Sequence, residues 1–256
     1  MMQTVPRRVQ AHAPHSVAQS GASETDREGV PDATSSPPSS IRPTGVKPLL
    51  RGVSHQIAFF VALASTAWLV MHCRTRTGAM ASVVCGASLV LLFGTSALYH
   101  RVDWTPAARQ RMRRMDHAAI FMLIGGGYTP LFALVALPNG GHGALAAIWI
   151  AAGIGVVKSL AWPNAPKWLT ALVCLGMGWM VIGQVVGRTP VVGATTVGLI
   201  FGSGFAFTAG AIVYASKRPD PWPRVFGYHE IFHLLVIVAC SFLFAHVVLV
   251  VNAVAA

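Results

Sequence analysis

The sequence contains few charged residues. They make up 11% of the 256 residues, and only 8 are Asp or Glu, whereas about 25% is usual in soluble proteins. A soluble domain of this size needs a charged surface, so the deficit excludes that class. Hydrophobic residues reach 54% of the chain. Most of the chain is therefore expected to be surrounded by lipid.

Cysteines and signal-peptide features are also scarce. Four cysteines are too few for a disulfide scaffold, and because Cys73, Cys85, Cys174 and Cys240 lie in or at the end of apolar runs, we expect small packing residues. Residues 1–45 are rich in Ser, Thr, Pro, Gly and charge, which predicts a disordered tail. This tail lacks the apolar core of a signal peptide. We therefore expect the first transmembrane helix to direct insertion.

Long apolar runs are what the sequence has in abundance. Seven runs follow the tail, each near the roughly 20 residues that a helix needs to cross the hydrocarbon core. They cover residues 56–73, 80–100, 118–137, 143–162, 168–187, 191–215 and 228–254. This pattern predicts an all-α polytopic membrane protein, with a bundle of seven transmembrane helices in residues 46–256. Thr105-Pro106 also predicts the start of a short, basic interfacial helix before the third run.

The positions of Lys and Arg predict the orientation. The net charge is +11, but the basic residues lie in short connections rather than in one patch, which excludes nucleic acid as the expected partner. Seven helices place 16 of the 19 basic residues on the side of the N-terminal tail and 3 on the other side. Because basic loops stay in the cytoplasm, we expect the N-terminus inside and the C-terminus outside.

Several ionisable residues interrupt the ends of the apolar runs. Such groups are costly in lipid and are functional candidates by default. His100 ends the second run with Ser96 four residues earlier, Asp116 precedes the third, and His229 and His233 begin the seventh. A spacing of four places two residues on one helix face. The topology brings all these residues to the cytoplasmic leaflet.

Three imidazoles and a water molecule form a catalytic zinc arrangement. We therefore predict a zinc site held by His100, His229 and His233. Asp116 would hold or deprotonate the water, and Ser96 would orient it or contact the substrate.

The remaining histidines are expected to lie outside the ligand set. His246 is thirteen residues beyond His233 on the same helix, so it cannot reach the same metal. His117 is expected to lie next to the ligand set or at the interface, and His55, His72 and His142 are expected at the membrane interface.

Residues 229–233 also match H-E-x-x-H, the zinc-protease motif in which the glutamate is the general base. A usual third ligand is missing, because no Asp or Glu follows Glu230 and position 239 is Ala. We interpret the match as incidental, with Glu230 in the cytoplasmic headgroup region.

Three segments together are similar to a known family. GTSALYHRVDW (94–104), RRMDHAAIFMLIGGGYTP (113–130) and FGYHEIFHLLVI (226–237) resemble the hemolysin III branch of the progestin and adipoQ receptor family. The resemblance covers about residues 50–256. It implies a zinc site in the cytoplasmic leaflet, with His100, His229 and His233 as ligands and Asp116 on the zinc-bound water. It also implies kinship with membrane hydrolases that cleave ceramide amide bonds.

The leading hypothesis is a zinc-dependent hydrolase of a lipid amide or ester, with a ceramide-like or other acyl lipid as substrate. The short loops are typical of a multi-pass protein of a bacterial inner membrane. Two alternatives remain open. One is a non-enzymatic membrane-homeostasis or receptor-like protein with structural zinc, and the other is a cytolytic or channel-like protein.

Overall fold

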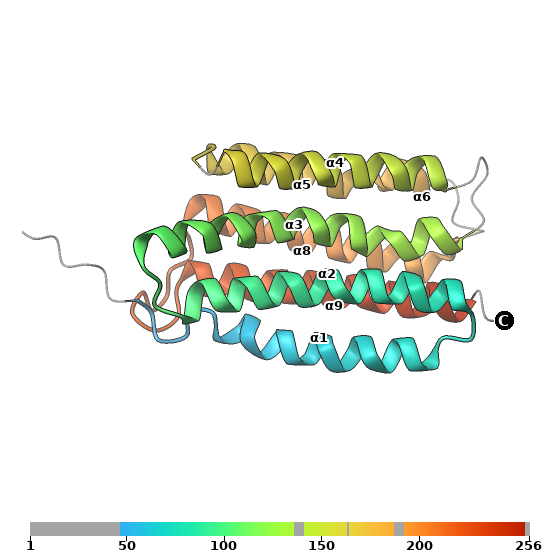
Figure 1. Ribbon diagram of the computed structural model, residues 1–256, viewed down its shortest axis with the longest axis horizontal. Helices are drawn as coiled ribbons and strands as arrows, with labels where there is room; N and C mark the ends of the chain where they lie inside the picture. Colours follow the sequence, from blue (N-terminus) through green and yellow to red (C-terminus); the bar gives the residue numbers. More distant parts are fainter. Residues whose placement is uncertain (1–46, 136–140, 163, 187–191, 254–256) are drawn as a thin grey trace, which may run out of the picture. The chain divides into compact units, whose positions relative to one another are not determined.

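The computed structural model describes residues 47–135, 141–162, 164–186 and 192–253, which all belong to the compact unit Gly45–Ala256. The predicted tail 1–45 lies outside these described residues. Within them, seven helices are long and apolar enough to cross a membrane, and no strand occurs (Figure 1). The all-α, seven-span prediction is thus confirmed.

The helices follow the apolar runs closely. They are α1 (Val53–His72), α2 (Arg76–Arg101), α3 (Pro106–Leu134), α4 (His142–Ala161), α5 (Lys167–Met180), α6 (Ile182–Val185), α8 (Ala194–Ser216) and α9 (Tyr228–Ala253). Helices α5 and α6 together form one span, Trp168–Val185. Apart from the start of the third run, the expected boundaries agree with the observed ones to within a few residues.

Helix α3 differs from its prediction. The sequence predicts a separate interfacial helix, but the basic segment and the third span form one helix of 29 residues. Its predicted start is confirmed, because the Thr105 side chain accepts a hydrogen bond from the Ala108 backbone N–H at 3.4 Å and Pro106 is the first helical residue. Residues 107–124 contain no Gly or Pro and are rich in Ala, Arg and Met. These strong helix formers extend the helix without a break.

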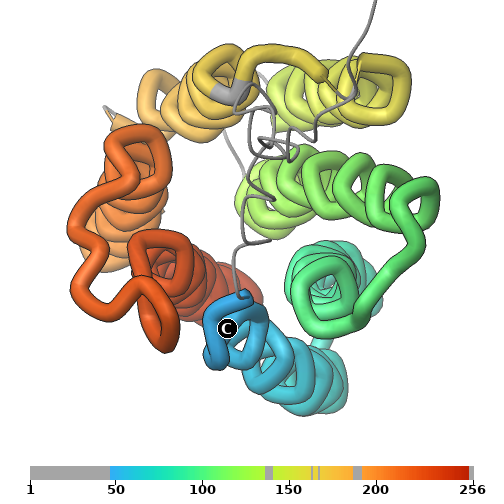
Figure 2. Tube along the Cα trace, turned by 90° about the vertical axis from the view of Figure 1, so that its left-hand side faces the viewer, coloured from blue at the N-terminus to red at the C-terminus, as the bar shows by residue number. Residues whose placement is uncertain are grey.

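Helices α1 to α4 pack in sequence order, each on the next, and α8 packs on α9. Helix α2 packs between α1 and α3, and α9 packs on α8 and also contacts α1, α2 and α3. Figure 2 views the helices end-on and shows α9 (red) beside α1 (blue) and α8 (orange). The last helix in the sequence therefore closes onto the first three.

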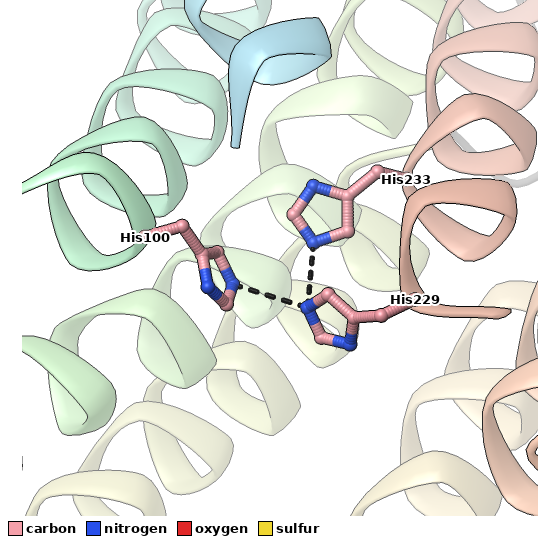
Figure 3. A group of neighbouring side chains, drawn as sticks. All are labelled: His100, His229 and His233. Atoms are coloured by element: carbon pink, nitrogen blue, oxygen red, sulfur yellow. Dashed lines mark hydrogen bonds between the residues drawn. The ribbon is translucent and has the colours of Figure 1, made fainter. Parts of the chain in front are cut away.

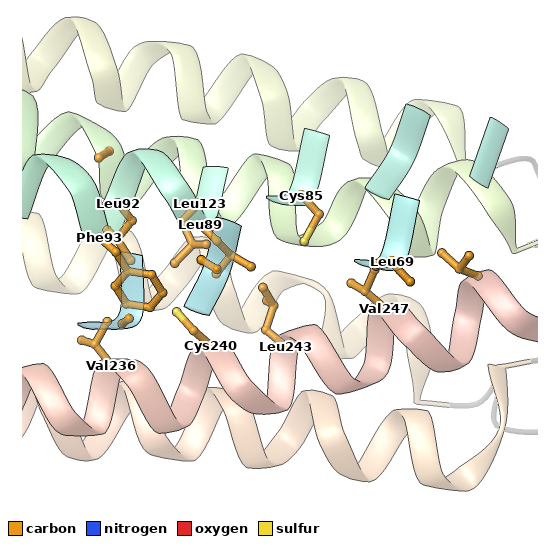
Figure 4. Close-up of a cluster of buried hydrophobic side chains, with 14 residues drawn as sticks. Leu69, Cys85, Leu89, Leu92, Phe93, Leu123, Val236, Cys240, Leu243 and Val247 are labelled. Atoms are coloured by element: carbon orange, nitrogen blue, oxygen red, sulfur yellow. The ribbon is translucent and has the colours of Figure 1, made fainter. Parts of the chain in front are cut away.

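A buried apolar cluster joins α1, α2, α3 and α9 (Figure 4). It includes Leu69, Cys85, Leu89, Leu123, Val236, Cys240, Leu243 and Val247. The two cysteines are packing residues, as predicted. Gly126 lets α3 approach α2 closely, because a Cβ atom there would lie 2.6 Å from the Ser88 Cβ atom. These contacts fix the relative positions of the helices that carry the candidate site.

Residues 47–52 and the connections α2–α3, α4–α5 and α8–α9 lie at the same end of the helices (Figure 1), which we call the basic end. The backbone N–H groups of Leu49 and Leu50 donate to the carbonyls of Arg224 and Val225, both at 3.2 Å. The Lys47 ammonium donates to the Arg101 carbonyl at 3.1 Å. The segment before α1 therefore contacts both the α2–α3 and the α8–α9 connections, which lead into α3 and α9.

Candidate metal centre

Three histidines converge at the basic end. His100 comes from the last turn of α2, and His229 and His233 come from the first two turns of α9. The Nε2 atom of His229 lies 3.2 Å from that of His100 and 3.0 Å from that of His233, and the three donor atoms all lie within 4.8 Å of one another. Figure 3 shows the rings turned toward one another. The structure thus brings together the three predicted ligands.

The donor geometry fits a metal ion. Zinc–nitrogen bonds of about 2.0–2.1 Å in a tetrahedron place the nitrogens roughly 3.3 Å apart, close to the two short separations observed here. A neutral imidazole has only one N–H donor, so hydrogen bonds alone satisfy this triangle poorly. A cation would satisfy all three lone pairs. The group could therefore hold a metal ion, and imidazole nitrogens suit zinc, copper, iron and nickel.

Exposure differs among the three ligand candidates. His100 is 7% exposed and His233 is 2% exposed, whereas His229 is half-buried. His229 is therefore the most accessible of the three candidate ligands.

Asp116 and Ser96 lie next to each other on α3 and α2. The Ser96 hydroxyl is within hydrogen-bonding reach of the Asp116 carboxyl group, and Ser96 is buried. Tyr214 of α8 lies near both parts of the site, because its ring centroid is 5.8 Å from that of His229 and it is within electrostatic range of Asp116. Asp116 is not among the donors that cluster with the three histidines. It lies beside that group.

Glu230 is enclosed by protein. It is only 3% exposed. Its Oε2 atom accepts a hydrogen bond from the Gly227 backbone N–H at 2.9 Å, and its Oε1 atom forms an ion pair with Arg51. A third-position glutamate that reaches back to the residue before the helix is half of a capping box. Both oxygens are thus engaged in holding the start of α9, which disfavours the H-E-x-x-H general-base interpretation.

The other carboxylates also have identifiable roles. Residues 47–253 contain four acidic residues. Asp103 pairs with Lys47 at 3.3 Å, Asp220 accepts a hydrogen bond from the first backbone N–H of α9 at 2.9 Å, and Glu230 caps the same helix. Asp116 is the fourth. It is the acid whose partner, Ser96, lies one turn before His100 on α2.

Sequence reasoning missed Arg51, His55 and Tyr214. His55 was expected at the membrane interface, and its contact with the site was not predicted. It is 3% exposed and lies against His233, with ring centroids 3.9 Å apart. The sequence feature that identified His100 also applies to His55, because both are polar residues near the end of an apolar run. His246 is fully buried and, as predicted, does not join the three histidines.

Comparisons with known proteins identify the family of this chain. The family described as Haemolysin-III related matches residues 44–244, a range that contains all three histidines. The chain is 25% identical to Hemolysin-3 of Bacillus cereus over 199 residues, which cover 77% of this chain and 88% of that protein. It is 24% identical to the Hemolysin-3 homolog of Bacillus subtilis (strain 168) over 192 residues, or 74% and 87% of the two chains. The chain therefore belongs to the haemolysin-III-related family, the hemolysin III branch of the progestin and adipoQ receptor family.

Proposed function

We propose that this protein is a zinc-dependent membrane hydrolase that cleaves an amide or ester bond of a lipid. The observation that carries the proposal is the convergence of His100, His229 and His233 at one end of a bundle of apolar helices. The acyl carbonyls of membrane lipids lie between the headgroups and the hydrocarbon, at the depth expected for helix ends. A metal site at that depth meets such carbonyls directly.

The residues beside the histidines suit hydrolysis. When bound, zinc supplies Lewis acidity toward a carbonyl oxygen and toward water. Asp116 accepts a proton from the attacking water, and the Ser96 hydroxyl holds the carboxyl group in place. Water adds to the acyl carbon, the bond to nitrogen or oxygen breaks, and Asp116 returns the proton to the leaving group. The products are a fatty acid and an amine or alcohol.

The location follows from the charge distribution. With 16 of the 19 basic residues on the side of the tail, the basic end faces the cytoplasm. We place the protein in a bacterial inner membrane with the metal centre in the cytoplasmic leaflet. Its substrate is then a lipid of that leaflet, either ceramide-like or another acyl lipid.

Two other functions compete with hydrolysis. In a structural role, zinc would stabilise the bundle without lipid turnover. Structural zinc sites have four protein ligands as a rule, and the three-histidine group with Asp116 beside it favours the catalytic alternative. The second rival is lysis, which the names of the relatives suggest. It predicts ion leakage from liposomes that contain the protein.

The test is metal-dependent lipid turnover. Purified protein should bind about one zinc per chain and release fatty acid from at least one member of a panel of ceramide and acyl-ester lipids. Removal of zinc by a chelator should stop the release, and added zinc should restore it. Zinc-loaded protein that releases no fatty acid from the panel would overturn the hydrolase proposal. Liposome leakage by the same protein would then favour the lytic function.

A further inference from the structure

His233 lacks the contact that usually fixes a metal-ligating histidine. Such a ligand ordinarily donates its second ring N–H to a carbonyl or carboxylate, and this hydrogen bond sets the orientation of the ring. Within the described residues, the buried Nδ1 atom of His233 has no hydrogen-bond partner. Its Nε2 atom nevertheless lies with those of the other ligands (Figure 3). Another contact must therefore hold the ring.

His55 of α1 supplies such a contact. Its ring lies over that of His233, with centroids 3.9 Å apart and an interplanar angle of 32°. Its Nε2 atom is 3.3 Å from the backbone carbonyl oxygen of His233. Because a carbonyl only accepts hydrogen bonds, this nitrogen is the protonated one. His55 therefore holds both the ring and the backbone of the same residue.

The position of His55 is itself fixed. It is 3% exposed, and the ring of Phe93 packs edge-on against it with centroids 5.1 Å apart. A histidine confined on both sides has few alternative rotamers, so its contact with His233 is preorganised. His55 is not one of the three clustered donors.

Neighbours of His55 contact the rest of the site. Gly52 has a φ angle of +79°, and a Cβ atom there would lie 2.7 Å from the Cβ atom of His100. Arg51 pairs with Glu230, which adjoins His229. Residues 51–55 thus reach all three histidines, two by direct contact and one through its neighbour.

We infer that His55 is a positioning residue of the metal centre, which holds the His233 ring in its ligating orientation in place of a hydrogen bond to Nδ1. The inference rests on the metal site of the proposed function, but it does not require hydrolysis. Loss of a residue that orients a ligand typically weakens metal binding about 10–100-fold. We expect a loss of that size when His55 is replaced.

Zinc affinity and cobalt spectra test this role. The full chain in detergent would be titrated with zinc against a chelator and with Co²⁺, whose visible spectrum reports ligand geometry. His55→Ala removes both contacts, His55→Phe keeps a ring, and His55→Gln keeps an N–H donor. We expect the largest loss of zinc affinity for His55→Ala, partial rescue in the other two variants, and an altered Co²⁺ spectrum in all three. His246→Phe is the matched control, because His246 is also fully buried but is remote from the site.

The outcomes separate the two proposals. Wild-type affinity and an unchanged Co²⁺ spectrum in the folded His55 variants would overturn the positioning role alone. Failure of the wild-type protein to bind either metal would overturn the metal centre and the positioning role together. If His55→Ala does not fold, His55→Phe and His55→Gln decide the matter, because they keep most of the side-chain volume.

Discussion

Asp116 and Glu230 are both carboxylates at the basic end, but their surroundings suit them to different tasks. Glu230 uses one oxygen to cap α9 and the other to neutralise Arg51. Asp116 lies within reach of a hydroxyl, that of Ser96. An ionised carboxylate can accept about four hydrogen bonds, so Asp116 retains capacity to accept a hydrogen bond from a water molecule. Proximity to a histidine motif alone does not distinguish the two residues, whereas their partners do.

This difference predicts opposite phenotypes for two isosteric substitutions. Asp116→Asn should retain zinc and lose about 10²-fold or more in lipid hydrolysis, because the proton acceptor is gone. Glu230→Gln should instead lower the unfolding temperature, because it leaves Arg51 without its counter-ion. We expect about 1–3 kcal/mol of destabilisation, less than the roughly 3–5 kcal/mol of a fully buried pair, because the Arg51 side chain is 24% exposed.

Zinc content, lipid turnover and thermal unfolding measured on both variants distinguish the roles. In a working H-E-x-x-H protease the ranking reverses: Glu230→Gln would abolish peptide cleavage, and Asp116→Asn would lose zinc. Arg51→Gln is the control for the ion pair. Combined with Glu230→Gln, it should destabilise by less than the sum of the two single changes.

At the scale of the helices, hydropathy predicts where the spans lie and how deep their residues are. It does not predict which helices contact one another. The seven apolar runs predicted the helices correctly, because a backbone in lipid must satisfy its hydrogen bonds internally and a helix does so. The start of α3 at Thr105-Pro106 was predicted, but its continuity with the third span was missed. Its first turns are basic and fall outside an apolar run, although their residues are good helix formers. Hydropathy also indicates how deep a residue lies in the membrane, but not which neighbouring helix its side chain faces. It placed His55 near a helix end, but could not indicate that the side chain faces α9.

Contacts between distant segments show the same limit. Arg51 and Glu230 are 179 residues apart, and no periodicity links them. The grouping of the three candidate ligands was predictable because helical spacing and topology together place them at one end of the bundle. The contacts that support them depend on which helix packs against which, and that arrangement is set by close approaches at small residues.

The close approach of α4 to α3 can be tested, because α4 carries two glycines in contrasting environments. A Cβ atom at Gly155 would lie 2.5 Å from the Cγ atom of Phe121, whose ring is fully buried, whereas a Cβ atom at Gly153 would have no neighbour within 4 Å. Gly155→Ala should therefore destabilise the protein by about 1–3 kcal/mol through overpacking. Gly153→Ala should cause no loss, because alanine favours the helix. Equal unfolding temperatures for the two variants would contradict the α3–α4 packing described here.

At the scale of the whole molecule, the metal centre depends on topology. An odd number of spans brings the end of α2 and the starts of α3 and α9 to the same side, and the basic residues predict that this side is cytoplasmic. A reporter that is active only in the cytoplasm should be active when fused after Asp103. It should be inactive when fused after Arg74 or after Ala256. Activity after Ala256 would mean an even number of spans and would separate the predicted ligands.

The most direct test of the metal centre is the zinc content of purified protein and of its single-histidine variants. The wild-type chain should carry about one zinc. His100→Ala, His229→Ala and His233→Ala should each lose most of it, because a three-ligand site has no redundancy. His246→Ala should keep its zinc, because that side chain lies outside the cluster. Full zinc occupancy in all three ligand variants would contradict the metal centre.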